Sequence, residues 1–160
     1  NIDQYIVSCP EKDKLCAVTK IMKKENLHKV IVFCNTKNEA SRVCEKLSRQ
    51  GLKAEALHGD IGQGARNRVM DDYRSSKFDV LVATDVVARG IDVDDVEGIF
   101  NYNIPKENEL YLHRIGRTAR AGKSGKAFSL VAYLDRQRMD EIIRYTKVDP
   151  KPYEMDSGEA

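Results

Sequence analysis

Two arginines three residues apart are the feature of the sequence with the clearest chemical potential. Arg117 and Arg120 lie in the run HRIGRTAR at 113–120, and on a helical turn this spacing places both on one side. Gly116 removes bulk beside them. Two guanidinium groups directed at one point can hold terminal phosphate oxygens and stabilise the charge that grows during phosphoryl transfer. Ordinary surface ion pairs use the same residues, so the residues alone leave both interpretations open.

The surroundings of this run are basic. Between Glu109 and Asp135 there is no acidic residue, and basic residues recur at every third position. These residues are Arg114, Arg117, Arg120, Lys123 and Lys126. The net charge of the whole chain is only +2, so a patch of one sign, and not the bulk charge, indicates a surface for a polyanion. A solvated basic face is the alternative.

The stretch GRTARAGKS at 116–124 resembles a phosphate-binding P-loop but does not fit one. It has one residue too many between its glycines, and a helix is expected before it and a strand after it, which is the reverse of the P-loop order. The segment Val80–Asp85 resembles a magnesium-binding strand end, but without a P-loop this reading has little support. We therefore expect the chain to lack the groups that hold a triphosphate and its metal.

A second polar segment, TDVVARGID at Thr84–Asp92, follows the strongest apolar run. Asp85 and Asp92 can accept hydrogen bonds from hydroxyls or arginines, and Arg89 can donate them. Gly90 permits a close approach of the backbone or a positive φ. A structural turn with internal Asp–Arg pairing is the alternative.

Gln63 and Arg66 stand at the front of an expected helix, where free backbone amides and a basic side chain can meet a phosphate. An exposed helix start without a ligand is the alternative. His58 and His113 have no partners at metal-ligand spacing, so we expect no metal site.

Apolar runs alternate with amphipathic stretches, which predicts right-handed β-α-β crossovers and an α/β fold with a parallel sheet covered by helices on both faces. Polar residues follow three of the strands, at 35–36, 58–60 and 84–92, and ligands of such sheets bind beyond the carboxyl ends of the strands. The expected strands are 5–7, 29–34, 53–57, 79–83, 96–102 and 126–132, and the expected helices are 10–22, 36–50, 63–74, 107–115 and 135–146. The helix at 36–50 opens on a capping box of Thr36 and Glu39.

At 160 residues the chain fits one domain, which we place at 1–148, with 149–160 as a disordered tail because of its prolines and acidic residues. No apolar run approaches the roughly 20 residues of a membrane span. The four cysteines are scattered, without zinc spacing, and Cys34 and Cys44 fit core positions. The cysteine pattern favours the reducing cytoplasm, or the nucleus in a eukaryote. We expect the isolated domain to be monomeric.

Together these segments resemble the second RecA-like domain of DEAD-box RNA helicases, within superfamily 2, from about Gln4 to Thr146. Val30–Thr36 (VIVFCNT) resembles motif IV of that family, and HGDIGQGAR at 58–66 its H-G-x-x-x-Q-x-x-R segment. TDVVARGID is similar to motif V and HRIGRTAR to motif VI. The chain departs from the pattern at Ala119, where the family usually has Gly, and in the two glycines that flank Gln63.

The resemblance implies a three-layer RecA-like domain and a role for each matching residue. Arg117 and Arg120 would contact the γ-phosphate of ATP and act in catalysis, and Asp92 would bind the ribose. His113, Arg89 and Asp85 would belong to a network that couples the two domains. The residues expected along the RNA sugar-phosphate backbone are Asn35, Thr36, Gly59, Arg66 and Thr84.

The same resemblance implies that ATP and Mg²⁺ are held mainly by an N-terminal RecA-like domain of the same protein. Closure of the two domains on ATP and RNA would deliver the arginines and separate a short RNA duplex locally. The isolated chain is then expected to hydrolyse no ATP, since the P-loop and the DEAD motif are absent. A regulatory RNA-binding module without motor activity and a DNA-acting relative are the alternatives.

Overall fold

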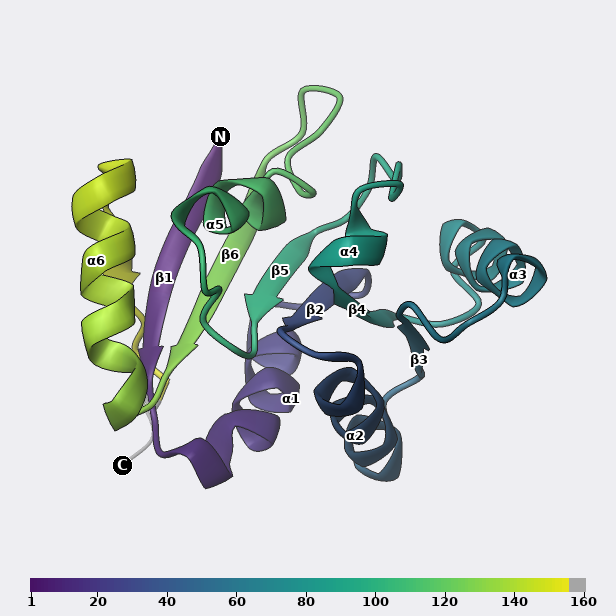
Figure 1. Ribbon diagram of the computed structural model, residues 1–160, viewed down its shortest axis with the longest axis horizontal. Coiled ribbons are helices and arrows are strands. Elements are labelled where there is room, and N and C mark those ends of the chain that lie inside the picture. The colour runs from purple at the N-terminus through teal and green to yellow at the C-terminus, as the bar shows by residue number, and fades with distance from the viewer. Residues whose placement is uncertain (156–160) are drawn as a thin grey trace.

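The computed structural model describes residues 1–155 and contains one sheet of seven parallel strands (Figure 1). The strands lie in the order β3-β4-β2-β5-β6-β1-β7. They are β1 (Ile2–Ser8), β2 (Val30–Cys34), β3 (Ala54–Leu57), β4 (Val80–Thr84), β5 (Gly98–Asn101), β6 (Gly125–Val131) and β7 (Lys151–Pro152). The predicted parallel α/β fold is confirmed.

Helices cover both faces of the sheet because the apolar residues of each strand alternate between two cores. In β2, Ile31 and Phe33 belong to one core and Val30, Val32 and Cys34 to the other. The first core is covered by α3 (Gln63–Arg74), α4 (Asp85–Ala88), α5 (Asn108–Ile115) and α6 (Arg136–Thr146). The second core is covered by α1 (Lys14–Lys24) and α2 (Lys37–Arg49).

Local sequence signals set several helix ends. The Thr36 side chain accepts a hydrogen bond from the Glu39 backbone N–H at 3.1 Å, which caps α2. The predicted capping box is only half formed, since the Glu39 carboxylate pairs with Arg42 at 2.9 Å. Two short 3₁₀ turns, Glu11–Asp13 and Tyr133–Asp135, precede α1 and α6.

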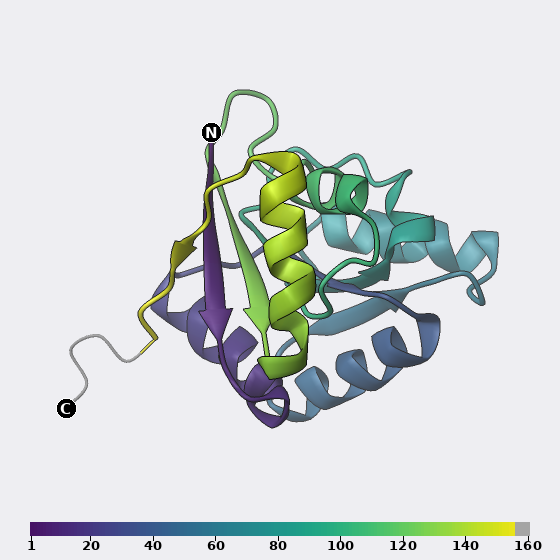
Figure 2. The same ribbon diagram turned by 60° about the vertical axis from the view of Figure 1, so that its left-hand side comes forward.

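The segment after α6 departs from the expected disordered tail. Lys151 and Pro152 pair with Tyr5 and Ile6 of β1 as an edge strand, where proline is tolerated (Figure 2). Tyr153 then packs edge-on against Tyr5 and Phe128, with ring centroids 5.3 and 5.4 Å apart. Aromatic burial therefore orders residues 149–155, and the expectation for 156–160 lies outside the described residues.

Of the three polar segments expected at the carboxyl edge of the sheet, 35–36 and 58–60 follow the ends of β2 and β3, but 84–92 lies there only at its start. Thr84 and Asp85 stand at the carboxyl end of β4, but the chain then returns to the start of β5 through 89–97. Glu97 donates to the Lys29 carbonyl just before β2 and accepts from Lys126 near the start of β6. The segment 89–97 is therefore carried toward the amino edge, close to the loop 116–124 (Figure 1), and Asp92 lies 3.1 Å from Arg120 of that loop. Among residues 1–155 no helix is long and apolar enough to cross a membrane.

Candidate functional site

The two arginines lie in a loop that follows α5, not on a helical turn. Helix α5 ends at Ile115, with Gly116 as its C-cap, and the chain reaches β6 only at Gly125. Three residues of this arginine loop, 116–124, have left-handed backbone angles: Ala119 (φ 57°), Ala121 (φ 56°) and Gly122 (φ 79°). The expectation that helical spacing aligns Arg117 and Arg120 is therefore wrong. Tight turns set their directions instead.

Both arginines nevertheless contact the same neighbouring segment, Ile91–Asp94. Arg117 Nη1 donates to the Ile91 carbonyl at 3.1 Å. Arg120 Nη2 lies 3.1 Å from Asp92 Oδ1, and its Nε lies 4.0 Å from Asp94 Oδ1. Such exposed ion pairs contribute only about 0–1 kcal/mol, so an incoming anion can replace them at little cost.

The electrostatics of Arg117 also favour an anion. Burial, followed by repulsion from Arg120, lowers the pKa of its guanidinium below the usual range, and Asp92 opposes this only in part. A phosphate placed between the two arginines would relieve this repulsion. The arginine loop thus holds two cations close together, and the charge of Arg117 is only partly compensated.

A buried ion pair joins α5 to the start of α4. Arg114 is 1% exposed, and its guanidinium forms a two-pronged interaction with Asp85, with both N–O distances at 2.7 Å. The Arg114 Cζ atom lies 5.3 Å from the centroid of the Phe33 ring. The same guanidinium donates to Asn103 O at 2.8 Å, Asn35 Oδ1 at 2.7 Å and Asn101 Oδ1 at 3.2 Å. Burial of the charge is acceptable because all of these acceptors surround it.

Arg114 was not among the predicted site residues, although helical spacing contained the signal. Tyr111 and Ile115 are large hydrophobic residues of the same helix. Arg114 follows Tyr111 by three positions and precedes Ile115, so helical spacing places it on the same buried side. A buried arginine requires an acidic partner. Asp85, predicted as an interdomain residue, is that partner.

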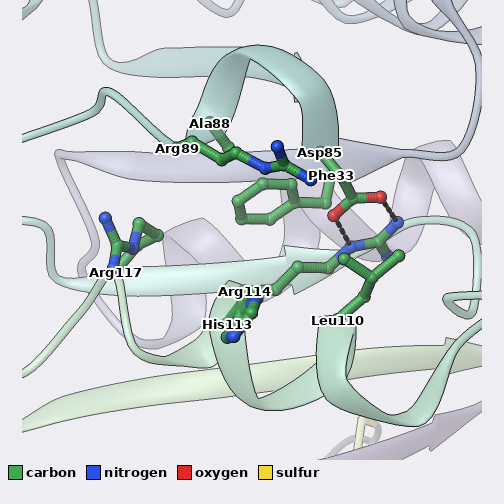
Figure 3. A pocket seen from close by; sticks show the side chains of 8 residues that line it. All are labelled: Phe33, Asp85, Ala88, Arg89, Leu110, His113, Arg114 and Arg117. Carbon is green, nitrogen blue, oxygen red and sulfur yellow. Dashed lines mark hydrogen bonds and ion pairs between the residues drawn. The ribbon is translucent and has the colours of Figure 1, made fainter.

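A pocket of about 230 Å³ opens beside this ion pair (Figure 3). Its lining consists of Phe33, Asp85, Ala88, Arg89, Leu110, His113, Arg114 and Arg117. All three residues predicted to couple the domains, Asp85, Arg89 and His113, therefore lie around one cavity. Arg89 and His113 are exposed, whereas the Asp85–Arg114 pair and Phe33 lie deeper. The cavity can therefore bind a negatively charged group that also has some apolar surface.

A second hollow, of about 510 Å³, lies between α3 and α4. Gln63 and Arg66 contribute from the first turns of α3, and Val86 and Gly90 from α4 and the loop after it. The Arg66 Nε–H is buried and has no hydrogen-bond acceptor among residues 1–155. A buried donor without a partner is costly, so an acceptor supplied by a ligand would stabilise this side chain.

Comparison with known proteins assigns the chain to a family. A model of the helicase conserved C-terminal domain matches residues 13–122. ATP-dependent RNA helicase FAL1 of Candida glabrata is 36% identical over 159 residues, which is 99% of this chain and 40% of that protein. A DEAD box protein from the hyperthermophile Methanococcus jannaschii superposes with a TM-score of 0.88 at 38% identity, covering 96% of this chain and 42% of that one. The chain belongs to the C-terminal domains of DEAD-box helicases.

A third relative was solved with ligands. S. cerevisiae Dbp5 bound to RNA and ADP BeF3 superposes on this helicase domain with a TM-score of 0.90 at 32% identity, over 98% of this chain and 42% of that one. The domain therefore spans about two fifths of the length of these relatives. The predicted family and the RecA-like fold are both confirmed.

The remaining residues predicted to bind RNA have different environments in this helicase domain. Asn35 uses both ends of its amide internally, since Oδ1 accepts from Arg114 and Nδ2 donates to the Ile104 carbonyl at 3.1 Å. The Thr36 side chain caps α2, and Thr84 is 6% exposed at the start of α4. Gly59 is exposed, with open space around its Cα. Thr36 is exposed, whereas Asn35 is half-buried and its backbone N–H donates to Asn103 Oδ1 at 2.8 Å.

No group of three or more His, Cys, Asp and Glu residues that could hold a metal occurs within the described part of this helicase domain. Cys34 is buried, and burial raises the pKa of its thiol to about 12. Cys44, predicted as a core residue, is only half-buried. Neither thiol is placed to react at the site.

Replacing Ala119 by glycine should stabilise the helicase domain by about 1 kcal/mol, because an L-residue at a left-handed φ is strained and glycine is not. Urea denaturation of the wild type and the variant measures the change. Ala65→Gly is a matched control, since Ala65 is exposed on α3 and glycine inside a helix costs about 1 kcal/mol. A loss of stability at both positions would contradict the assigned backbone of the arginine loop.

Proposed function

We propose that this domain is the second half of an ATP-dependent RNA helicase, a hydrolase, and that it completes an ATP site whose larger part lies on an N-terminal RecA-like domain. The observation that carries the proposal is the convergence of Arg117 and Arg120 on the segment Ile91–Asp94, in a chain of this family. Relatives named as ATP-dependent RNA helicases support it.

The residues present fit one end of a nucleotide. The neighbouring guanidinium groups of Arg117 and Arg120 suit the terminal phosphate of ATP, and the exposed Asp92 carboxylate suits the hydroxyls of a ribose. ATP, when bound, supplies the phosphoryl group that is transferred to water. Arg117 and Arg120 would then stabilise the charge that develops on the phosphate oxygens.

The fit does not extend to the metal. The sequence lacks a P-loop, and the described residues form no cluster that could hold a divalent cation. We propose that the N-terminal domain binds Mg²⁺ and most of the triphosphate. Such a division makes hydrolysis depend on closure of the two domains, because neither part is sufficient by itself.

We propose that the RNA-binding surface follows the carboxyl edge of the sheet, with Arg66, Thr84, Gly59 and the loop at 35–36. The unpartnered Arg66 Nε–H supports this proposal, since a phosphate oxygen would satisfy it. Contacts of this type read the backbone and not the bases, so binding should depend weakly on sequence and strongly on salt. The structure of Dbp5 bound to RNA and ADP BeF3 is consistent with this role for the fold.

The coupling proposal concerns the pocket lined by Asp85, Arg89 and His113. It opens between α4 and α5, next to the arginine loop, and an acidic group of the N-terminal domain would complement its two exposed basic residues. Because ATP and RNA would both bind across the two domains, each would favour the closed state and increase the affinity for the other. Closure would hold RNA in a bent form that an A-form duplex cannot follow, so a short duplex would separate.

The isolated 160-residue chain should hydrolyse no ATP, whereas the full-length protein should hydrolyse ATP when RNA is added. The assay measures phosphate release with RNA, with DNA of the same sequence and without nucleic acid. Stimulation by RNA alone is the expected result. Equal stimulation by DNA would favour a DNA-acting relative, and turnover by the isolated chain would show that the site is not divided.

A further inference from the structure

Thr118 lies between the two arginines, yet it points into the protein. It is 2% exposed, and its backbone N–H donates to the Ile115 carbonyl at 3.2 Å. Its hydroxyl donates to the carbonyl of Val96 in a buried hydrogen bond. The arginine loop is therefore not attached at its ends alone, because its middle is fixed by one polar side chain.

Gly125 provides the space that Thr118 occupies. A Cβ atom at Gly125 would lie 2.6 Å from Thr118 Cγ2 and 2.9 Å from the backbone nitrogen of Ala119, closer than real Cβ atoms are found. Gly125 is the first residue of β6 and pairs with Ile2 of β1. Because Gly125 has no side chain, Thr118 and Ala119 of the arginine loop can pack directly against the first residue of β6.

The acceptor of the Thr118 hydroxyl is also held rigidly. Val96 is 2% exposed, and its neighbour Glu97 donates to the Lys29 carbonyl at 2.8 Å and accepts from the Lys126 N–H at 3.2 Å. Val96 lies next to the last residue of the loop 89–97, which carries Asp92. One hydrogen bond therefore connects the loop of Arg117 and Arg120 to the loop that both arginines contact.

We propose that Thr118 is a positioning residue for ATP hydrolysis: its hydroxyl, seated against Gly125, sets where the two arginines lie relative to Asp92. The inference rests on the proposed function of those arginines. Ala119 and Ala121 hold strained left-handed angles, so the loop needs a firm attachment to keep this conformation. A displacement of about 1 Å in a group that contacts the reacting atoms can reduce the rate about 100-fold.

The test compares Thr118→Val with Thr118→Ser in the full-length protein. Valine keeps the shape and removes the donor, whereas serine keeps the donor and removes a methyl group. We expect Thr118→Val to lower kcat of RNA-stimulated ATP hydrolysis by about 10- to 100-fold, with little change in KM for ATP, and Thr118→Ser to restore most of kcat. Gly125→Ala should lower kcat in the same way, since it displaces Thr118.

A purely structural role would lower the melting temperature without changing kcat of the folded protein, so both are measured. Thr19→Val is the matched control: Thr19 donates to Gln50 Oε1 at 2.6 Å on the opposite face of the sheet, and its removal should leave kcat unchanged. The proposal would be overturned if Thr118→Val kept the wild-type kcat. It would also be overturned if kcat of Thr118→Ser were as low as that of Thr118→Val. Arg117→Ala is measured in parallel to test the proposed function itself. If Arg117 has no role in hydrolysis, this variant keeps the wild-type kcat.

Discussion

Alanine at Arg117 or at Arg120 should abolish RNA-stimulated ATP hydrolysis in the full-length protein and leave ATP binding largely intact. An arginine that stabilises phosphoryl transfer contributes about 10³- to 10⁵-fold in rate, or about 4–7 kcal/mol of transition-state stabilisation. Binding should change little because we propose that the N-terminal domain holds most of the nucleotide. Steady-state kinetics with saturating RNA and a separate measurement of nucleotide affinity test both parts.

Two controls sharpen this experiment. Lys123 is exposed in the same arginine loop, so Lys123→Ala removes a positive charge of that loop and should leave kcat nearly unchanged. Arg120→Ala also leaves Asp92 without its ion-pair partner. Asp92→Ala is therefore measured to separate the loss of this ion pair from the loss of the Arg120 guanidinium. A change confined to KM in Arg117→Ala would indicate ordinary ground-state binding and would contradict the proposed role in catalysis.

Arg114→Ala should destabilise the domain by about 3–5 kcal/mol, the range for breaking a buried ion pair from one side. The substitution leaves Asp85 without its partner and removes donors from Asn35, Asn101 and the Asn103 carbonyl. It also leaves a cavity beside Phe33. Chemical denaturation of the domain measures the loss.

Arg144 offers a matched control for this prediction. It is exposed on α6, so Arg144→Ala should change the free energy of unfolding by no more than about 0.5 kcal/mol. Arg114→Lys keeps the charge but cannot supply the planar set of donors, and we expect a partial loss. A change below about 1 kcal/mol in Arg114→Ala would show that the ion pair is not essential to the fold.

The sheet and its helices were predictable because the apolar pattern of the sequence reports burial directly. The strand Val30–Cys34 is apolar at every position and is completely buried, and the signal for α2 included a capping residue that the structure uses. The end of the chain was not predictable in this way. Tyr153 orders it through contacts with Tyr5 and Phe128, which are far away in sequence.

The arrangement of the candidate site residues could not be predicted from the sequence. Spacing suggested that Arg117 and Arg120 share a helical face, whereas left-handed residues in a loop direct them. Strand order suggested one edge for all the polar loops, whereas the segment after α4 carries Asp92 back along the sheet. Asn35 was predicted to lie along the RNA backbone, and in the structure its side-chain oxygen accepts a hydrogen bond from Arg114. Each of these outcomes depends on contacts between distant segments, which a local pattern does not contain.

The attachment of α4 at Asp85 has a mechanical consequence. This helix has only four residues, and its first residue, Asp85, is held to α5 by the two hydrogen bonds from the Arg114 guanidinium. Thr84 precedes it on the side proposed for RNA, and Asp92 follows it on the side proposed for ATP. A displacement of either end would therefore reach α5 through the Asp85–Arg114 ion pair. In the proposed closure we therefore expect α4 and α5 to move as one unit.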